Sequence, residues 1–308
     1  MKKYVSIDIG GTAIKYGLID GDGTILDRNQ MATQSWLGGP SVLKKAMDIV
    51  ESCRQKEEVS GICISTAGMV DPVKGEIFHS APLIPEYAGT RFKETMETAF
   101  HIPCEVENDV NCAALAEYVS GAARGSRTAL MLTVGTGIGG CLIMDGEIYH
   151  GFGNSACEVG YMHMRGSDFQ TLGAASILAK KVAKWKKEPE EQWSGYRIFE
   201  EAKKKDAVCI RAIDEMVDTL GLGIANICYV VNPEIVVLGG GIMAQKEFLS
   251  DRINRAVTQY LIPVIASQTR LAFAEHENDA GMLGAFYHFM SCRGKDKERK
   301  LWNTILNQ

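Results

Sequence analysis

Short apolar runs separated by glycine-rich turns open the chain. YVSIDI at 4–9 and IKYGLI at 14–19 alternate apolar and polar positions, and a Gly-Gly-Thr turn at 10–12 separates them. An Asp-Gly turn at 20–23 leads into a third short run, TILD at 24–27. Alternating apolar runs bounded by Gly and Asp predict three antiparallel strands joined as a β-meander.

The same pattern begins again about 125 residues later. ALMLTV at 129–134 predicts a strand, GTGIGG at 135–140 a turn, and CLIM at 141–144 a second strand before an Asp-Gly turn into EIYHG. A shift of about 125 residues superimposes Gly135 on Gly10 and Asp145 on Asp20. A repeat of whole-domain size predicts two similar α/β lobes that face each other across a cleft.

The remaining pattern alternates helices with buried strands. Helices are predicted at 41–54, from Val110 to a stop at Gly121, through much of 172–231, and at about 245–260 and 280–290. Strands are predicted at 61–66, 104–108, 234–238 and 270–275. We therefore expect an N-terminal lobe at 1–118 and a C-terminal lobe at 119–279. A C-terminal helix at about 280–308 could pack back on the first lobe.

Composition narrows the class of protein. The chain has 308 residues, of which 46% are hydrophobic and 23% charged, a length and composition that favour two soluble domains. A net charge of −5 argues against a nucleic-acid-binding role, and no apolar run is long enough for a secretory signal or a membrane span. Nine scattered cysteines without a C-x-x-C pair suggest neither a disulfide framework nor a four-cysteine zinc site, so we expect a cytoplasmic protein with reduced thiols.

Three glycine-rich turns, at 10–12, 135–140 and 239–241, each follow an apolar strand. Glycine lets backbone N–H groups approach phosphate oxygens, so three such turns in one chain favour a nucleotide site. The run GTGIGG also matches the dinucleotide fingerprint G-x-G-x-x-G, but that fingerprint must open a helix, and a strand follows here. A dehydrogenase is therefore disfavoured, and no Walker A loop is present.

Four motifs together resemble the ROK family of sugar kinases and repressors. The run from Asp8 to Lys15, DIGGTAIK, resembles its first phosphate motif, and TVGTGIGG from Thr133 is similar to its second. ENDVN, with Asn108 and Asp109, resembles its sugar and catalytic-base motif, and NPEIVVLGGG its adenosine-side motif. The similarity runs from about residue 4 to 290. It implies a two-lobed, actin-like (ribonuclease H-like) fold, ATP and Mg²⁺ as cofactors, and a homodimer.

The resemblance also implies roles for individual residues. For the nucleotide it implies Gly10, Gly11, Thr12, Lys15, Thr133, Gly135, Thr136, Gly137, Gly139, Gly240 and Gly241, with Asp8 holding Mg²⁺–ATP through water. For the sugar it implies Gly68, Asn108, Asp109, Asn154 and Glu158, with Asp109 as the general base. From their own chemistry, Asp109 fits a helix N-cap equally well, Asp8 a turn cap, and Lys15 a solvated strand residue.

Two departures from the family pattern affect the prediction. ROK proteins usually read Glu-x-Gly-His followed by a cysteine-rich zinc loop, whereas Tyr161 replaces that histidine here, His163 comes two residues too late, and 162–208 contain no cysteine. We therefore expect no zinc site. Leu83 lies about where many members place an asparagine that contacts the sugar.

Besides a sugar kinase, the resemblance leaves two other functions to consider: a sugar-responsive repressor and a sugar-binding protein without turnover. STAGMVDPVKGEIF and SACEVGYMHM look like the zinc-less ROK kinases of amino-sugar catabolism, which favours 6-phosphorylation of N-acetylmannosamine over glucose or a β-glucoside. A sugar-responsive repressor would need a DNA-binding segment before the first motif, and we expect none because Asp8 is only eight residues into the chain. A sugar-binding protein without turnover is disfavoured by the intact Asp8, Asp109 and phosphate turns.

Overall fold

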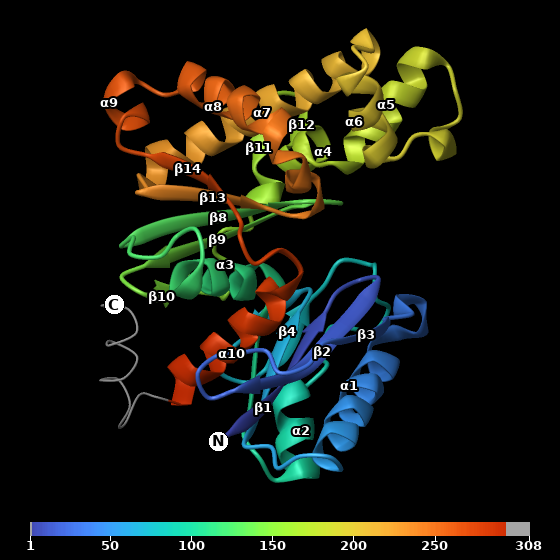
Figure 1. The fold of residues 1–308 in the computed structure, drawn as a ribbon, viewed down its shortest axis with the longest axis vertical. Helices are drawn as coiled ribbons and strands as arrows, with labels where there is room; N and C mark the ends of the chain where they lie inside the picture. Colours follow the sequence, from blue (N-terminus) through green and yellow to red (C-terminus); the bar gives the residue numbers. More distant parts are fainter. Residues whose placement is uncertain (1, 294–308) are drawn as a thin grey trace. The chain divides into compact units, whose positions relative to one another are not determined.

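The computed structural model describes residues 2–293, which form two compact units (Figure 1). Within the described residues, unit 1 comprises 2–125, 148–156 and 278–293, and unit 2 comprises 126–147 and 157–277. Residues 119–125 and 148–156 thus group with the first unit, whereas the predicted lobes placed both segments in the second. One cause is a hydrogen bond between His150 and Glu107, which ties the later segment to a strand of unit 1.

The sheet of unit 1 has the order β3-β2-β1-β4-β7. Antiparallel β1 (Lys3–Ile9), β2 (Ala13–Asp20) and β3 (Asn29–Ala32) form the meander, and β4 (Gly61–Thr66) and β7 (Cys104–Asn108) extend the sheet parallel to β1. The strand predicted at 24–27 is wrong. Only Ile25 bridges to Ile19 there, because the Leu18 N–H donates to the side chain of Asp27 instead of to a ladder carbonyl.

Alternation along β1 gives the sheet of unit 1 two different faces. Val5, Ile7 and Ile9 are fully buried in a core shared with α1 (Gly38–Arg54) and α2 (Phe92–Phe100). The opposite face packs against α3 (Asp109–Ser120) and α10 (Ala280–Arg293). There the ring of Tyr4 lies 5.3 Å from that of Phe286. Asp8 follows the alternation of Tyr4 and therefore points to the α10 face.

The C-terminal helix predicted at 280–290 is confirmed as α10, and it packs on unit 1. Residues 294–308, which the prediction included in this helix, lie outside the described residues. A small hairpin of β5 (Met69–Asp71) and β6 (Glu76–His79) completes the unit, together with the short helix η1 (Ser35–Leu37).

Unit 2 repeats the strand order of unit 1, here β10-β9-β8-β13-β14. β8 (Thr128–Val134) runs antiparallel to β9 (Ile138–Met144) and parallel to β13 (Ile235–Gly239), and β14 (Arg270–Phe273) continues parallel. The edge strand β10 (Glu147–Ile148) has two residues. A shift of 125 residues carries both ends of β1 onto the corresponding ends of β8. The predicted repeat is confirmed.

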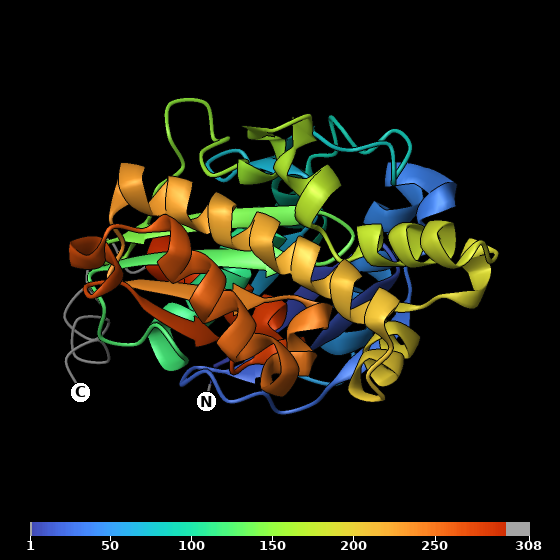
Figure 2. The ribbon, with the colours of Figure 1, turned by 90° about the horizontal axis from the view of Figure 1, so that it is seen from above.

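Helices cover one side of this second sheet (Figure 2). The helices of unit 2 are α4 (Phe169–Gly173), α5 (Ser176–Lys186), α6 (Gly195–Lys203), α7 (Ala207–Val231), α8 (Lys246–Tyr260) and α9 (Pro263–Ala266), with the short helices η2 (Val159–Tyr161), η3 (Glu190–Gln192) and η4 (Gly241–Gln245). The unit also has a hairpin of β11 (His163–Met164) and β12 (Ser167–Asp168), and the short helix η5 (Glu277–Asp279) begins at its last residue. α7 and α8 pack closely because a Cβ at Gly221 would lie 2.6 Å from the Cβ of Ala256. Within residues 2–293, no helix combines the length and apolar character needed to cross a membrane.

Candidate functional site

Three parallel strands of unit 1 end at the same edge of the sheet. The register pairs Asp8 of β1 with Ser65 of β4, and Ser65 with Glu107 of β7, so the three side chains form a row across the α10 face. Ser65 Oγ donates to Asp8 Oδ1 at 2.7 Å. The carboxyl edge of this sheet therefore gathers two carboxylates and a hydroxyl at the start of α3.

Asp8 is enclosed by the helix across from it. A Cβ on Gly281, in the first turn of α10, would lie only 2.3 Å from Asp8 Cγ, so the helix backbone itself packs on the carboxylate. Burial raises the pKa of Asp8, and the Ser65 hydrogen bond and the charge of Lys15 offset only part of that rise. The turn after β1 is closed by the Gly10 N–H and the Ala13 carbonyl, so Asp8 is not a turn cap.

Asn108, and not Asp109, caps helix α3. Its Oδ1 accepts the N–H groups of Val110 at 2.9 Å and Asn111 at 3.1 Å, the bonding of an N-cap. Asp109 is the first residue within the helix, so the capping interpretation of Asp109 is wrong. Asn108 Nδ2 also donates to the Gly68 carbonyl at 2.9 Å and to Asp109 Oδ1 at 3.1 Å. The structure thus brings together three of the predicted sugar-site residues.

The environment of Asp109 raises the pKa of its carboxyl to about 7. Burial is the main cause, the negative charge of Asp8 adds to it, and hydrogen bonds from Val110 and Asn108 oppose it. A carboxylate whose pKa lies near neutral pH can accept a proton from a substrate and release it again. Asp109 therefore has the acid–base property that a general base needs.

Asn154 lies in the segment Ile148–Ala156, which belongs to unit 1. Its φ of 56° is left-handed, a conformation that asparagine tolerates. The segment is held by His150, whose ring bonds to Glu107 at 2.7 Å. Sequence reasoning gave His150 no role, and Ser65 and Gly281 none either. The alternation of CEVEN could have suggested Glu107, because it sets a carboxylate inside a buried strand.

The first phosphate turn lies beside the site just described. Among residues 2–293, the backbone N–H groups of Gly11 and Thr12 have no acceptor. A Cβ on Gly11 would lie 2.5 Å from Leu83 Cδ2, so the largely exposed Leu83 rests on this turn. The Lys15 amine donates to Asn278 Oδ1 at 2.9 Å, and Lys15 helps to line a cavity of about 250 Å³.

In unit 2 the second phosphate turn and the adenosine-side motif meet at the carboxyl ends of β8 and β13. The register pairs Thr133 with Gly239, and Gly240 follows with a φ of 94°. A Cβ on Gly240 would lie 2.3 Å from the Val134 carbonyl oxygen, so only glycine fits there. This edge holds all the predicted residues of the unit's nucleotide motifs: Thr133, Gly135, Thr136, Gly137, Gly139, Gly240 and Gly241.

Glu158 and the residues at the departures from the family pattern lie in unit 2. Glu158 is exposed and directly precedes η2, whose last residue, Tyr161, is half exposed. His163 pairs with Asp168 in the β11–β12 hairpin. Glu158 therefore belongs to a different unit from the other predicted sugar-site residues.

One group of side chains in unit 1 resembles a metal site. Glu105, His288 and Cys292 bring potential ligand atoms within 4.8 Å of one another, the only such group among residues 2–293. Both oxygens of Glu105 are already ion-paired, however, with Lys93 Nζ at 2.7 Å and Arg293 Nε at 2.8 Å. Two cations beside the carboxylate oppose a bound metal ion, so we interpret the group as an ion-pair cluster.

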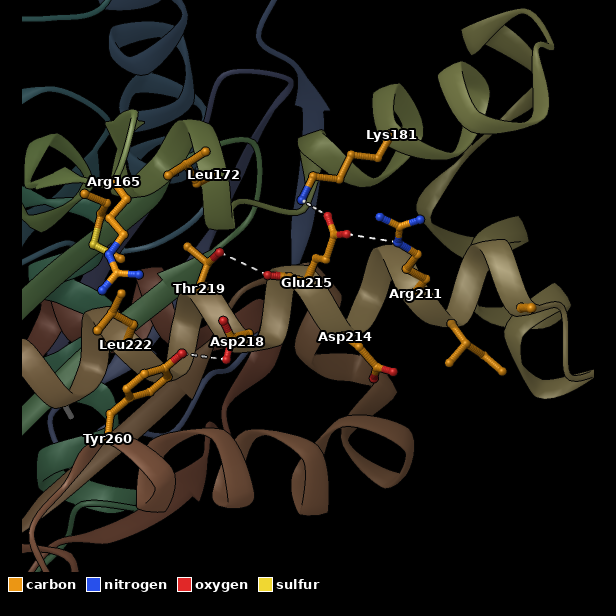
Figure 3. A pocket seen from close by; sticks show the side chains of 13 residues that line it. Arg165, Leu172, Lys181, Arg211, Asp214, Glu215, Asp218, Thr219, Leu222 and Tyr260 are labelled. Atoms are coloured by element: carbon orange, nitrogen blue, oxygen red, sulfur yellow. Dashed lines mark hydrogen bonds and ion pairs between the residues drawn. The ribbon is translucent and has the colours of Figure 1, made fainter.

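A cavity of about 720 Å³ opens among the helices of unit 2 (Figure 3). It contains none of the predicted site residues. Several of its polar side chains pair with one another: Lys181 bonds to Glu215 at 3.1 Å, and Tyr260 donates to Asp218 at 2.8 Å.

Comparison with known proteins agrees with the motifs. The model of the ROK family matches residues 4–291. The chain belongs to the ROK family. It is 46% identical over 289 residues to an uncharacterized Clostridium perfringens protein, covering 94% of this chain and 98% of that one. It is 32% identical over 296 residues to a beta-glucoside kinase of Listeria monocytogenes, covering 94% and 97%.

A solved structure shows the same fold. A Listeria monocytogenes protein proposed to be an N-acetylmannosamine kinase is 30% identical, with a TM-score of 0.84 over 94% of this chain and 99% of that one. The two repeated α/β units of this ROK protein are the two lobes of the actin-like fold, as the motifs predicted.

Proposed function

We propose that this ROK protein is an ATP-dependent sugar kinase that transfers the γ-phosphate to the 6-hydroxyl of a hexose or N-acylhexosamine. The observation that carries the proposal is the pair at the start of α3. Asn108 caps the helix, which leaves the adjacent Asp109, with a pKa of about 7, available for proton transfer. Sugar kinases among the relatives support the same reaction class.

In this mechanism Asp109 accepts the proton of the sugar hydroxyl as its oxygen attacks the γ-phosphorus. The bond between the γ-phosphorus and the bridging oxygen breaks, and ADP leaves with that electron pair. General base catalysis contributes about 10²–10⁴-fold in rate, and positioning and charge neutralisation supply much of the rest. Gly68, Asn108, Asn154 and Glu158 would bind the sugar, since amides and carboxylates match the paired donors and acceptors of hydroxyl groups.

The nucleotide would be held by the two phosphate turns and the adenosine-side glycines. The N–H groups of Gly11 and Thr12, which have no acceptor among the described residues, fit phosphate oxygens. Asp8 offers the hard oxygen that suits Mg²⁺ and would hold it through water. Mg²⁺ bound with ATP would neutralise phosphate charge, and Asp8 is the residue that would hold it.

We propose N-acetylmannosamine as the sugar. The likeness to the Listeria protein proposed to be an N-acetylmannosamine kinase supports this, as does Tyr161 in place of the usual histidine. Losing a zinc-anchored wall near Glu158 makes room for a 2-acetamido group. The same room would also suit the aglycone of a β-glucoside, and the 32% identity to a beta-glucoside kinase makes that the second candidate, with glucose as a third.

The test compares kcat/KM for N-acetylmannosamine, N-acetylglucosamine, glucose and cellobiose in a coupled ADP-release assay. A pocket shaped around the acetamido group should discriminate by roughly 10–200-fold. If glucose or cellobiose exceeds N-acetylmannosamine tenfold or more, the amino-sugar assignment fails and the kinase assignment stands. If no sugar releases ADP while calorimetry still detects sugar binding, the protein is a non-catalytic sugar-binding member instead.

A further inference from the structure

Glu107 is a buried carboxylate next to the proposed base. None of its surface is exposed, and its hydrogen-bonding capacity is used by three groups. Oε1 accepts the Asn108 N–H at 2.7 Å and Asn111 Nδ2 at 3.0 Å, and Oε2 bonds to His150 Nε2 at 2.7 Å. Two of these partners belong to the first turn of α3 and its cap, and the third belongs to a segment 43 residues away. Glu107 thus joins two parts of unit 1.

His150 holds both ends of its own loop. Its ring bonds to Glu107, while its carbonyl accepts the N–H of Ala156 at 3.1 Å. Residues 150–156 therefore close on His150, and Asn154, a proposed sugar ligand, lies within this closed loop. Gly151 tightens it, because its φ is 71° and a Cβ there would lie 3.0 Å from Ala156 Cβ. The imidazole of His150 thus ties this loop to β7.

Glu107 favours the protonated, charged form of His150. Burial alone would lower the pKa of His150, but the hydrogen bond and negative charge of Glu107 raise it above its usual value. His288 of α10 lies farther from Glu107, with its Nδ1 3.7 Å from Oε2. Burial lowers the pKa of His288, which disfavours its charged form, so His150 is the main partner of Glu107. Charge-assisted hydrogen bonds are roughly twice as strong as neutral ones, and a buried one restrains both partners.

We propose that His150, through Glu107, is a positioning residue for sugar binding. It holds the loop that carries Asn154 against the strand that ends in Asn108. His150 acts through its neighbours and exchanges no proton with the substrate. The inference rests on the proposed function, since it assumes that Asn108 and Asn154 bind the sugar.

The experiment measures KM for sugar and for ATP in the full-length protein and in three variants. The sugar is whichever of the four panel sugars the wild type phosphorylates fastest. His150→Ala removes the bond, and His150→Gln keeps an N–H donor at about the position of Nε2. Tyr149→Ala is the control, because the adjacent Tyr149 side chain is half exposed.

For His150→Ala we expect the sugar KM to rise by about tenfold, as loss of a hydrogen bond to a buried charge would cause, with the ATP KM unchanged. His150→Gln should recover most of the sugar affinity, and Tyr149→Ala should match the wild type. A His150→Ala sugar KM within twofold of wild type overturns the proposal, and so does an equal rise in both KM values with a lowered melting temperature.

If the His150→Ala variant does not fold, the sugar KM of the His150→Gln variant tests the proposal. A tenfold rise in its sugar KM, in a folded variant, overturns the hydrogen-bond role, and a near-wild-type value supports it. The two proposals fail differently. A wild type that phosphorylates none of the four sugars contradicts the kinase function, whereas an active wild type with an unaffected His150→Ala variant contradicts only the role of His150.

Discussion

Asn108 and Asp109 are adjacent in the chain and have different roles: the first caps helix α3, and the second is the proposed general base. Asn108 satisfies the first N–H groups of α3, while Asp109 carries the raised pKa. Loss of an N-cap residue typically lowers the stability of a protein by about 1 kcal/mol, so a substitution at a capping position would destabilise the helix. Because Asn108 takes that role, Asp109 can be replaced without losing the start of the helix.

Asp109→Asn keeps the size of the side chain and removes the base. We expect kcat to fall at least ~10²-fold, with sugar binding largely kept and the variant still folded. Steady-state kinetics, calorimetry with sugar and a thermal melt check the three parts. Near-wild-type turnover of the folded variant would reject Asp109 as the base.

The pKa of Asp109 also sets an expected pH profile. The base must be ionised to act, so kcat/KM for sugar should fall as the pH drops below about 7, and the residual activity of Asp109→Asn should lack this acid limb. A flat wild-type profile between pH 5.5 and 8 contradicts the assignment.

The same shift has an opposite effect on folding. A carboxyl whose pKa rises from 3.8 to about 7 on folding stabilises the protein below pH 3.8, and that contribution is lost as the pH rises through 7. Asp109→Asn should therefore melt higher than the wild type at pH 8, by a margin that shrinks toward pH 5.

At the scale of elements, the carboxyl ends of β8 and β13 form the proposed nucleotide site of unit 2, and their backbones approach each other closely there. Gly240 lets β13 turn against the end of β8, where its φ of 94° and the nearby Val134 carbonyl leave no room for a side chain. The proposed nucleotide site of unit 2 depends on this contact.

Gly240→Ala should raise the KM for ATP roughly tenfold and leave the sugar KM unchanged, since a strained left-handed residue costs about 1–3 kcal/mol. Gly195→Ala is a matched control in the same unit. Nothing lies within 4 Å of the Cβ position at Gly195, so kinetics and stability should stay at wild-type values. Unchanged ATP affinity in Gly240→Ala would contradict a nucleotide role for this edge.

Strands that follow from a continuous run of apolar residues could be predicted from the sequence. Segments whose structure depends on contacts with residues farther along the chain could not. The buried strands β1, β4, β7 and β8 follow from apolar runs and were found within one residue. The strand expected at 24–27 failed because a single side chain, Asp27, took over a ladder bond.

In the candidate site, the sequence singled out Asn108 and Asp109 but could not say which one caps α3, because both residue types are preferred caps. Nor could it give His150 a partner, since the bond to Glu107 spans 43 residues of chain. Resemblance to the family supplied the proposed roles, and the geometry supplied the local reasons for them.

For the whole molecule, the described residues hold no set of side chains suited to structural zinc. All nine cysteines lie within residues 2–293 and none forms a disulfide, and Lys93 and Arg293 occupy the carboxylate of the one metal-like group. The two hydrophobic cores are built from apolar side chains of each unit. Folding should therefore not depend on a metal ion.

We accordingly expect the purified protein to contain no stoichiometric zinc and to keep its melting temperature in excess chelator, while activity requires added Mg²⁺. Elemental analysis and a thermal melt with and without chelator test this. About one tightly held zinc per chain, or a melting temperature that falls on chelation, would overturn the expectation.

The 125-residue repeat has a consequence for how the two halves have diverged. A shift of 125 sets Asp8 on Thr133, so equivalent positions in the matching strands β1 and β8 carry an ionisable carboxyl in one half and a neutral hydroxyl in the other. An ancestral duplication would have begun with the same residue in both places. The two halves therefore share their strand order but differ in chemistry, with an acidic residue in β1 and a neutral one at the equivalent position of β8.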